Sequence, residues 1–299
     1  MSAIIKTQNL TKVFGKTVAV ENLNLEVNEG EVFGYLGPNG AGKSTTIKLL
    51  LNFINPTSGA VSVFGKNPQT QSIGILKDIG YIPGEIHLYE NLSGKEHLKF
   101  QAGLRDNVDW KYVESLAERL RINLKLKIKT LSHGNKQKIA IIGAFMHKPK
   151  LLILDEPTTG LDPLIQREFY SLVSEVNQAG STLFISSHIL PEVERVCHRV
   201  GILREGRLIE TEEIETLKNK AIRPLEVHFA KTVSKENFTN IEGVKNISIE
   251  NKILHCEIVG SLDKFIKELS KYEVVNIETR EADLEQIFLN YYSNKNNGT

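Results

Sequence analysis

The chain has 299 residues, a length that suits one large domain and a smaller one. Hydrophobic residues make up 40% and charged residues 24%, which is the composition of a packed globular protein and excludes a largely disordered chain. The formal net charge of +1 gives no overall attraction to nucleic acid or to anionic lipid.

The sequence predicts neither a signal peptide nor a membrane span. Its first residues lack a basic segment followed by a long apolar run, and apolar stretches such as 151–154 fall far short of the roughly 20 residues that cross a bilayer. The two cysteines, Cys197 and Cys256, are far apart and predict unpaired thiols in a reducing compartment. We therefore expect a cytoplasmic protein whose membrane role depends on a partner.

The first two hundred residues predict strands that alternate with helices. Leu23, Leu25 and Val27 alternate with polar residues, as in a half-buried antiparallel strand, whereas 31–36 is continuously apolar, as in a central strand. The remaining expected elements are a helix over about 43–51, a strand over 59–64, a helical region over 90–121, and a strand, helix and strand over 151–154, 163–178 and 182–186. This alternation predicts a largely parallel sheet with helices on its faces.

A polar stretch with a proline, 218–224, predicts a linker, and hence two domains over 1–220 and 221–299. The expected elements beyond it are strands over 225–230, 244–250, 253–259 and 273–278, a short helix after Ser234 and a helix over 262–269. This order is that of a small ferredoxin-like α+β domain. A last helix is predicted from the apolar stripe Leu284, Ile287, Phe288 and Tyr291.

The strongest chemical signal is a phosphate-loop pattern between the predicted strand over 31–36 and the helix after it. It reads Gly37-Pro38-Asn39-Gly40-Ala41-Gly42-Lys43-Ser44-Thr45. Glycines let successive backbone N–H groups curl around a phosphate, and the helix N-terminus adds a positive dipole. Lys43 supplies a charge for the β- and γ-phosphates, and Ser44 a hydroxyl for Mg²⁺. A plain glycine-rich turn does not require this lysine and serine.

A second signal is a pair of carboxylates, Asp155 and Glu156, which directly follows the apolar strand 151–154. Ligands of parallel sheets bind at this carboxyl edge. We expect Asp155 to hold Mg²⁺ through water and Glu156 to polarise the attacking water, a general-base role worth about 10²–10⁴ in rate. Without a phosphate loop, the same pair would equally suit a capped strand end at the surface.

Further motifs resemble those of ABC ATPases, in the order typical of that family. Leu131-Ser132-His133-Gly134-Asn135 resembles its signature loop, and Gly160-Leu161-Asp162 its D-loop. Ser186-Ser187-His188 resembles its switch histidine, and Phe14 matches the aromatic residue that stacks on adenine. The resemblance covers about residues 4–217 and implies a P-loop ABC ATPase domain with a mixed sheet core, an antiparallel β subdomain and a helical subdomain.

The resemblance implies a mechanism as well as a fold. Two such domains close face to face over two ATP molecules, so the second subunit is another copy or a homologous ATPase. Ser132 and Gly134 then contact the γ-phosphate held by the partner, and Asp162 belongs to the nucleotide-binding set. His188 senses the γ-phosphate and completes a catalytic set with Glu156 and Lys43. ATP and Mg²⁺ are the expected cofactors.

The chain departs from the family pattern in two loops. His133 stands where the family usually has glycine, and Asn135 where it usually has glutamine. Gly84 stands where a glutamine commonly ligates Mg²⁺, with Glu85 next to it. Two hypotheses stay open here: Glu85 or a water replaces the glutamine, or Gly84 only forms a turn and coordination is weaker.

The C-terminal segment 279–292 resembles the accessory tail of bacterial ABC exporter subunits. Together, the resemblances predict an ATPase that powers export through a separate integral-membrane permease and sits peripherally on the cytoplasmic face of the membrane. One alternative is a soluble ABC ATPase that acts on ribosomes or DNA, although the chain lacks a second ATPase domain, a heptad run and a basic patch. Another is a degenerate, nucleotide-sensing module, against which Lys43, Asp155, Glu156 and His188 argue.

Overall fold

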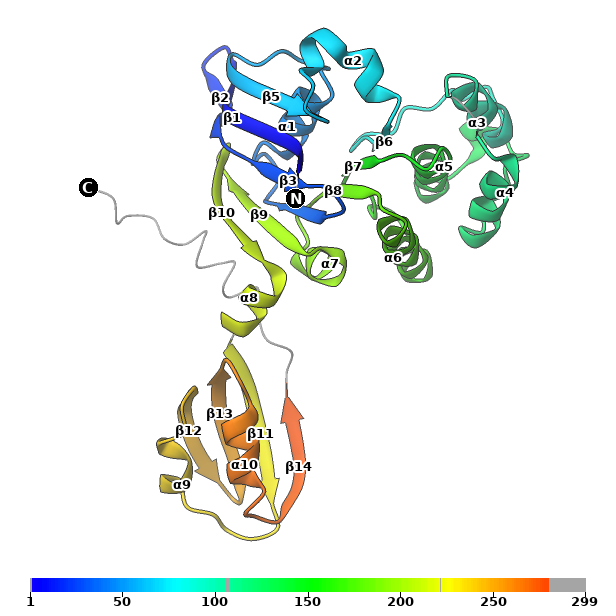
Figure 1. The fold of residues 1–299 in the computed structure, drawn as a ribbon. Coiled ribbons are helices and arrows are strands. Elements are labelled where there is room, and N and C mark those ends of the chain that lie inside the picture. Colours follow the sequence, from blue (N-terminus) through cyan, green and yellow to red (C-terminus); the bar gives the residue numbers. More distant parts are fainter. Residues whose placement is uncertain (1, 106–107, 221, 280–299) are drawn as a thin grey trace. The chain divides into compact units, whose positions relative to one another are not determined.

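The computed structural model describes residues 2–105, 108–220 and 222–279 (Figure 1). The predicted last helix, 284–291, lies outside these residues. Of the accessory tail motif, 279–292, only Thr279 is described. The chain packs as two compact units, Met1–Thr211 and Glu212–Thr299. The division into domains 1–220 and 221–299 stays a prediction.

The first unit contains an antiparallel sheet close to the N-terminus. Its strands are β1 (Ala3–Phe14), β2 (Thr17–Leu23), β3 (Glu26–Asn28) and β5 (Ser58–Val63), and β1 pairs with each of the other three. Leu23, Leu25 and Val27 are all buried, as their alternation predicts. They do not share one strand, however, because β2 ends at Leu23 and β3 begins at Glu26.

A six-stranded sheet forms the centre of this unit, in the order β10-β9-β4-β8-β7-β6. Its strands are β4 (Val32–Leu36), β6 (Ile79–Ile82), β7 (Leu151–Asp155), β8 (Thr182–Ser187), β9 (Arg199–Arg204) and β10 (Arg207–Glu213). The five strands β6, β7, β8, β4 and β9 run parallel. Every residue of β4, β7 and β8 is buried, which explains the apolar runs within these strands, while Asp155 and Ser186 are buried polar residues at their ends.

The helices of the first unit flank this sheet (Figure 1). They include α1 (Lys43–Leu50), α2 (Pro68–Leu76), α6 (Pro163–Gln178) and α7 (Leu190–Val196). The register pairs Leu36 of β4 with Ser187 of β8, and Ser186 of β8 with Asp155 of β7. The loops that leave these three strands therefore begin side by side at one edge of the sheet.

A helical part covers the predicted helical region and extends beyond it. It consists of α3 (Gly94–Ala102), α4 (Trp110–Arg119), the 3₁₀ turn Ile128–Thr130 and α5 (His133–Phe145). Arg119 joins it to α6 through Glu168 at 2.5 Å and Glu175 at 2.6 Å. Throughout the described ranges, no helix combines the length and the apolar character needed to cross a membrane.

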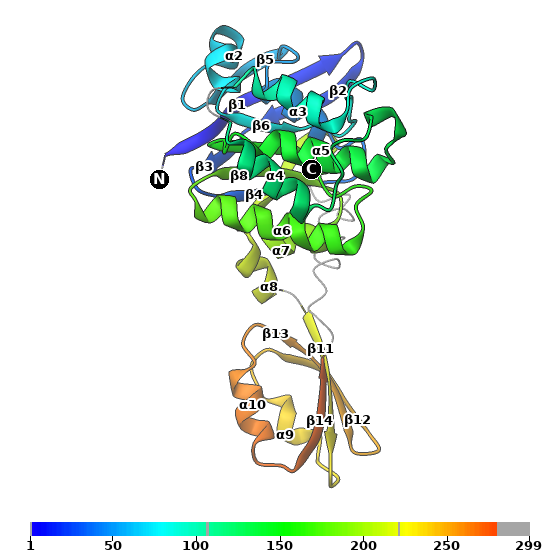
Figure 2. The ribbon, with the colours of Figure 1, turned by 90° about the vertical axis from the view of Figure 1, so that its right-hand side faces the viewer.

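The second unit has the predicted order of strands and helices. Its elements are α8 (Ile214–Lys220), β11 (Ile222–Phe229), α9 (Glu236–Thr239), β12 (Val244–Glu250), β13 (Ile253–Val259), α10 (Asp263–Leu269) and β14 (Val274–Thr279). The antiparallel sheet runs in the order β12-β13-β11-β14, and α9 and α10 lie on one side of it (Figure 2). Phe229, Phe238 and Phe265 form the core between helices and sheet. The opposite face of the sheet carries its polar side chains.

The predicted linker over 218–224 is wrong in position. The helix α8 continues to Lys220, and β11 already begins at Ile222. Pro224 misled the sequence-based boundary, although a strand tolerates proline where one of its edges is unpaired. Pro224 instead lies within β11 and pairs in register with Glu257 of β13. The two cysteines are buried and unpaired, as predicted.

Candidate nucleotide-binding site

The phosphate loop has the backbone that its glycines predict. Gly40 and Gly42 have φ values of 81° and 105°, in the left-handed region that favours glycine. A Cβ on Gly42 would also lie 2.4 Å from the carbonyl oxygen of Ala19. Gly42 has no side chain to cap α1, so the first N–H groups of the helix are available to an anion. Ser44 is exposed in this first turn.

Lys43, Glu156 and His188 form a continuous chain of contacts across the site. Lys43 Nζ donates to the carbonyl oxygens of Gly37 at 2.6 Å and Pro38 at 3.2 Å. Lys43 Nζ also forms an ion pair with Glu156 Oε1 at 3.2 Å. This oxygen accepts no hydrogen bond from the described residues. Glu156 Oε2 lies 2.8 Å from His188 Nδ1. The three predicted catalytic residues therefore lie together.

The backbone of Glu156 is held in an unfavourable conformation. Its φ of 49° lies in the left-handed region, which costs a non-glycine residue about 1–3 kcal/mol. Two contacts stabilise it, because the Glu156 N–H lies 3.2 Å from both the carbonyl and the hydroxyl oxygen of Ser186. This conformation directs the carboxylate between Lys43 and His188.

Asp155 offers a buried carboxylate with one oxygen available. The Ser186 hydroxyl donates to Oδ1, and only 2% of the residue is exposed. Oδ2 faces Gly84 and accepts no hydrogen bond from the residues the structure covers. Burial and the charge of Asp155 raise the pKa of the neighbouring Tyr81 to about 12. A carboxylate and the nearby Ser44 hydroxyl are oxygen donors of the kind that Mg²⁺ takes, so this edge fits a magnesium ion.

Two residues that support the site were not found from the sequence. Glu192 accepts hydrogen bonds from Ser187 at 2.9 Å and from Thr158 at 2.5 Å, and so connects the segments that follow β8 and β7. Gln137 of α5 donates from its buried Nε2 to the carbonyl oxygen of Pro157 at 2.7 Å. The partners of Gln137 and Thr158 are 20 and 34 residues away along the chain, so no local pattern signals them.

The predicted signature loop packs against the predicted D-loop of the same chain. A Cβ on Gly134 would lie 2.4 Å from the Gly160 carbonyl oxygen, and one on Gly160 would lie 2.7 Å from His133. Ser132 caps α5 by accepting from the Asn135 N–H at 3.4 Å. In the covered part of the chain, no hydrogen bond or ion pair joins 132–134 to 37–45. The structure does not bring these two loops of one chain together.

Asp162, Phe14 and Glu85 lie outside the Lys43–His188 chain of contacts. Asp162 caps α6 by accepting from the N–H groups of Leu164 and Ile165 at 3.1 Å, which gives it a structural role. Phe14 ends β1 with 49% of its surface exposed, and Lys12 Nζ lies over its ring, 4.9 Å from the centroid. The Glu85 side chain is 93% exposed, and its ion-pair partner is His87 at 3.9 Å.

The fold and this edge of the sheet define a P-loop ATPase. A model of the ABC transporter family matches residues 20–159. The bacitracin transport ATP-binding protein BcrA of Bacillus licheniformis is 37% identical over 302 residues, which cover 97% of each chain. The chain therefore belongs to the ABC transporter family and is an ATP-binding, ATP-hydrolysing subunit of a transporter. These relatives do not favour the ribosome or DNA alternative.

Two solved structures share the ABC ATPase fold. One, described as the ATP binding subunit of an ABC transporter, is 31% identical with a TM-score of 0.68, and the match covers 72% of this chain and 92% of that one. The other is the dimeric ATP-binding cassette MJ0796 bound to ADP and Pi, with 23% identity and a TM-score of 0.65 over 70% of this chain and 98% of that one. The predicted fold class is confirmed.

Proposed function

We propose that the chain hydrolyses ATP between two ATPase subunits and thereby powers export through a separate membrane permease. The observation that carries the proposal is the contact chain Lys43–Glu156–His188 beside the buried Asp155. At one edge of the sheet, Lys43 would bind phosphate, Glu156 would act as general base and His188 would donate a hydrogen bond to the γ-phosphate. Asp155 would hold the metal ion. Phosphoryl transfer to water needs this combination.

The arrangement supports a switch in the partners of Glu156. In the structure, its two carboxylate oxygens face Lys43 and His188. A γ-phosphate offers both groups a more highly charged partner, which leaves Glu156 free to polarise a water molecule. Asp155 and Ser44 would hold Mg²⁺, which supplies positive charge for the phosphate oxygens. Phe14 would stack on the adenine ring.

A second subunit would complete each site. Ser132 and Gly134 lie at the N-terminus of α5, where backbone N–H groups and the helix dipole attract an anion. Their loop contacts the predicted D-loop instead of the phosphate loop of its own chain. We infer that they reach the γ-phosphate bound by a partner, either another copy of the chain or a homologous subunit.

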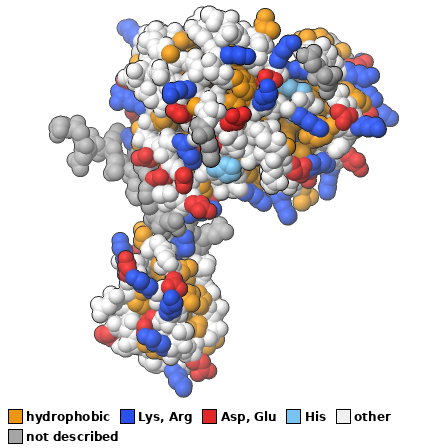
Figure 3. All heavy atoms as spheres, viewed as in Figure 1, with side chains coloured by type: hydrophobic (Ala, Val, Ile, Leu, Met, Phe, Trp, Pro, Cys, Tyr) orange, Lys and Arg blue, Asp and Glu red, His pale blue; other side chains and the backbone are white. Residues whose placement is uncertain are grey.

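The permease would dock in an apolar groove of about 540 Å³ between β6, α3 and α5. The apolar residues that line it include Ile73, Leu76, Ile86, Leu88 and Leu104. Ile73 and Leu104 are 78% and 68% exposed, and Figure 3 shows hydrophobic side chains at the surface in this region. Such exposed apolar surface marks an interaction site. Docking here would hold the subunit at the cytoplasmic face of the membrane. The groove is close to Gly84 along the chain, because Pro83 is one of its lining residues.

The cargo proposal comes from a relative whose match covers 97% of the chain. That protein is named for bacitracin transport, and its alignment includes the second unit as well as the ATPase unit. We infer that this chain serves export of a peptide antibiotic or a similar amphipathic compound. Deletion of its gene should then lower the tolerance of the cell to such compounds, and a Glu156→Gln copy should fail to restore it.

The proposed ATPase site is tested with purified Glu156→Gln. The variant should bind ATP as tightly as the unchanged protein but lose about 10²–10⁴ in turnover, because only the general base is removed. Glu118→Gln is the matched control, since Glu118 is exposed on α4, which contributes no residue to this site. Near-normal turnover of Glu156→Gln would refute the role of Glu156. Purification in mild detergent tests the other half: a multi-span membrane protein should accompany the tagged chain in stoichiometric amount.

A further inference from the structure

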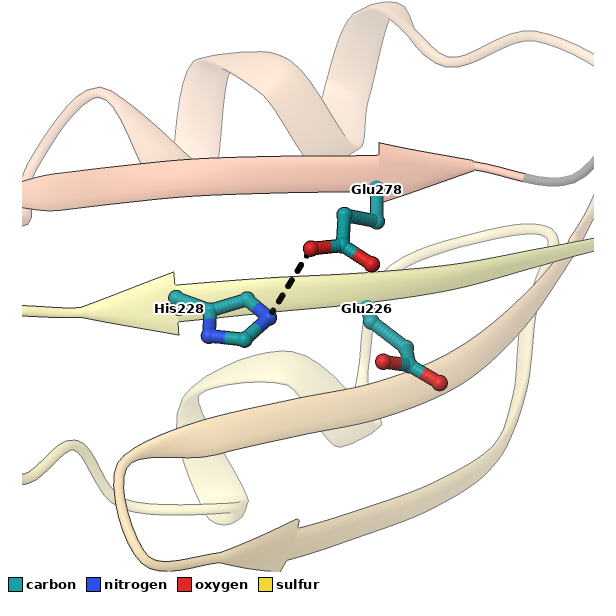
Figure 4. A group of neighbouring side chains, drawn as sticks. All are labelled: Glu226, His228 and Glu278. Atoms are coloured by element: carbon teal, nitrogen blue, oxygen red, sulfur yellow. Dashed lines mark ion pairs between the residues drawn. The ribbon is translucent and has the colours of Figure 1, made fainter.

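The open face of the second unit carries a cluster of histidine and glutamate side chains. Glu226 and His228 lie two residues apart on β11, so they point to the same side of the sheet. The register places Glu278 of β14 and His255 of β13 on either side of Glu226. Glu226, His228 and Glu278 form the group of mutually close ligand atoms, gathered over β11 and β14 in Figure 4, and His255 lies beside Glu226.

The distances in this cluster are close to those of a metal site. Ligand atoms of Glu226, His228 and Glu278 all lie within 4.8 Å of one another. His228 Nε2 lies 3.8 Å from Glu278 Oε1, and His255 Nδ1 lies 3.4 Å from Glu226 Oε1. Tetrahedral zinc with bonds of about 2.0–2.1 Å separates its ligand atoms by roughly 3.4 Å. The ligand atoms therefore have to approach one another by up to about 1.4 Å, which rotations of partly exposed side chains can supply.

A second observation points to a missing ligand. His228 Nε2 is shielded from solvent and has no hydrogen-bond partner among the described residues. Its 3.8 Å contact with Glu278 is too long for a hydrogen bond. A buried polar atom without a partner costs free energy, and this nitrogen faces carboxylate oxygens. A cation between them would satisfy the nitrogen and both glutamates at once.

Space for an ion to enter lies next to the cluster. A hollow of about 320 Å³ is lined by Glu226, His255, Glu257 and Glu278, among other residues. It is large enough to hold a hydrated ion, because one water molecule occupies about 30 Å³ in the liquid. The three glutamates also make the hollow electronegative, which attracts cations.

We propose that Glu226, His228 and Glu278 bind one divalent transition-metal ion, with His255 as the fourth ligand. A set of imidazole and carboxylate groups suits Zn²⁺ and similar ions, whereas Mg²⁺ and Ca²⁺ prefer oxygen ligands alone. The ion would tie the edge strand β14 to β11 and β13. Its ligands are separate from those of the nucleotide site. The competing interpretation is that these side chains form only cross-strand ion pairs, as surface histidines and glutamates often do.

The test is a titration of the full chain with Zn²⁺, after removal of metals by a chelator and without nucleotide. Calorimetry should show one equivalent bound. His228→Gln and Glu278→Gln should each weaken this binding at least tenfold, because loss of an indirect partner already costs about 10–100-fold at known metal sites. Co²⁺ should give the intense visible absorption of tetrahedral coordination, and His255→Gln should reduce that absorption.

Two control variants separate this site from others. His87→Gln removes an exposed histidine that lies 3.9 Å from Glu85, a pair that gains no third ligand in the part of the chain described. Asp155→Asn removes the carboxylate of the nucleotide site. Both controls should keep the full equivalent of Zn²⁺. Glu278 is 61% exposed, so Glu278→Gln is expected to fold even if His228→Gln does not.

Three outcomes would overturn the proposal. One is that the unchanged chain binds no Zn²⁺ at micromolar concentration. Another is that Glu278→Gln and His228→Gln bind the ion as well as the unchanged chain does. The third is that Asp155→Asn abolishes binding, which would place the ion in the nucleotide site.

Discussion

Gly84 lies directly against Asp155, so that a Cβ on Gly84 would be 3.1 Å from Asp155 Oδ2. The family commonly has a glutamine here, whereas in this chain the second oxygen of Asp155, the carboxylate proposed to hold Mg²⁺, faces backbone without a side chain. Glu85, the next residue, does not take the place of the glutamine in the structure, since its side chain is 93% exposed. This arrangement favours a water molecule in the space beside Gly84.

A methyl group at position 84 should therefore weaken magnesium binding. In Gly84→Ala, the new Cβ meets Asp155 Oδ2 at a distance that few real contacts show, and it displaces water from that oxygen. We expect the Mg²⁺ concentration for half-maximal ATPase activity to rise about tenfold, as with altered outer-shell partners of other metal ions. Steady-state hydrolysis at increasing Mg²⁺ measures this.

Glu85→Ala is the control for this prediction, because it removes a carboxylate from the same loop without touching Asp155. Its Mg²⁺ dependence should equal that of the unchanged chain. A shift in Glu85→Ala with none in Gly84→Ala would contradict the water model and restore Glu85 as the ligand.

The sequence predicted the parts of the site that depend on local patterns. The phosphate loop requires glycine at positions of positive φ, and Gly40 and Gly42 have those angles. Asp155 and Glu156 could be placed because they stand at the carboxyl end of a buried parallel strand, which ends at Asp155. The roles of the individual site residues in ATP hydrolysis stay predictions, which the variants proposed here address.

Contacts between distant segments were beyond the reach of the sequence. Glu192 looks like an ordinary charge on α7 until β7 and β8 bring Thr158 and Ser187 to it. Pro224 suggested a linker, because proline is depleted in strands, yet it lies within β11. The cluster around His228 likewise depends on the register of β11 with β14, which a single sequence does not reveal.

Glu192 should act as a positioning residue for catalysis. It accepts hydrogen bonds from Thr158, two residues after the proposed catalytic residue Glu156, and from Ser187, directly before the proposed catalytic residue His188. Glu192→Gln keeps an acceptor but removes the charge, so we expect kcat to fall roughly tenfold, about 1.4 kcal/mol, while KM for ATP changes little. Steady-state kinetics separates the two constants.

Thr158→Val completes a double-mutant cycle with Glu192→Gln. Because the two side chains share one hydrogen bond of 2.5 Å, the losses in kcat should not add. Fully additive losses, or a change confined to KM, would show that Glu192 does not position the catalytic segment.

Gln137 should contribute to stability through one buried hydrogen bond. Its Nε2 donates to the Pro157 carbonyl oxygen at 2.7 Å, and Gln137→Leu leaves that oxygen without this donor. Loss of a partner in a buried site costs about 1–3 kcal/mol. Urea unfolding of the purified chain measures the change. Gln178→Leu is the matched control, because its bond to Ser174 is exposed and its effect should stay within about 0.5 kcal/mol. Equal effects of the two substitutions would contradict the prediction.

His147 should make the protein sensitive to acid. Its Nε2 lies 3.1 Å from the Ile79 carbonyl oxygen and donates to it, whereas its Nδ1 is buried without a partner in the described structure. Burial, with a smaller contribution from the positive charge of Arg105, lowers the pKa of His147 to about 4, although Asp78 acts in the opposite direction. The folded protein therefore keeps this ring neutral at pH values where a free histidine is protonated.

The sign of the pH effect follows from the two pKa values of His147. The unfolded chain binds a proton near pH 6.5, but the folded chain binds it only near pH 4. The contribution of His147 is thus fully present above pH 6.5 and is lost as the pH falls toward 4. His147→Gln keeps an N–H donor for Ile79 but cannot titrate. Urea unfolding at pH 7.5 and pH 5 should show a smaller loss of stability in this variant than in the unchanged chain. The exposed His87→Gln should lose as much as the unchanged chain, and an identical loss in His147→Gln would disprove the assignment, because the proton taken up on unfolding would then belong to another group.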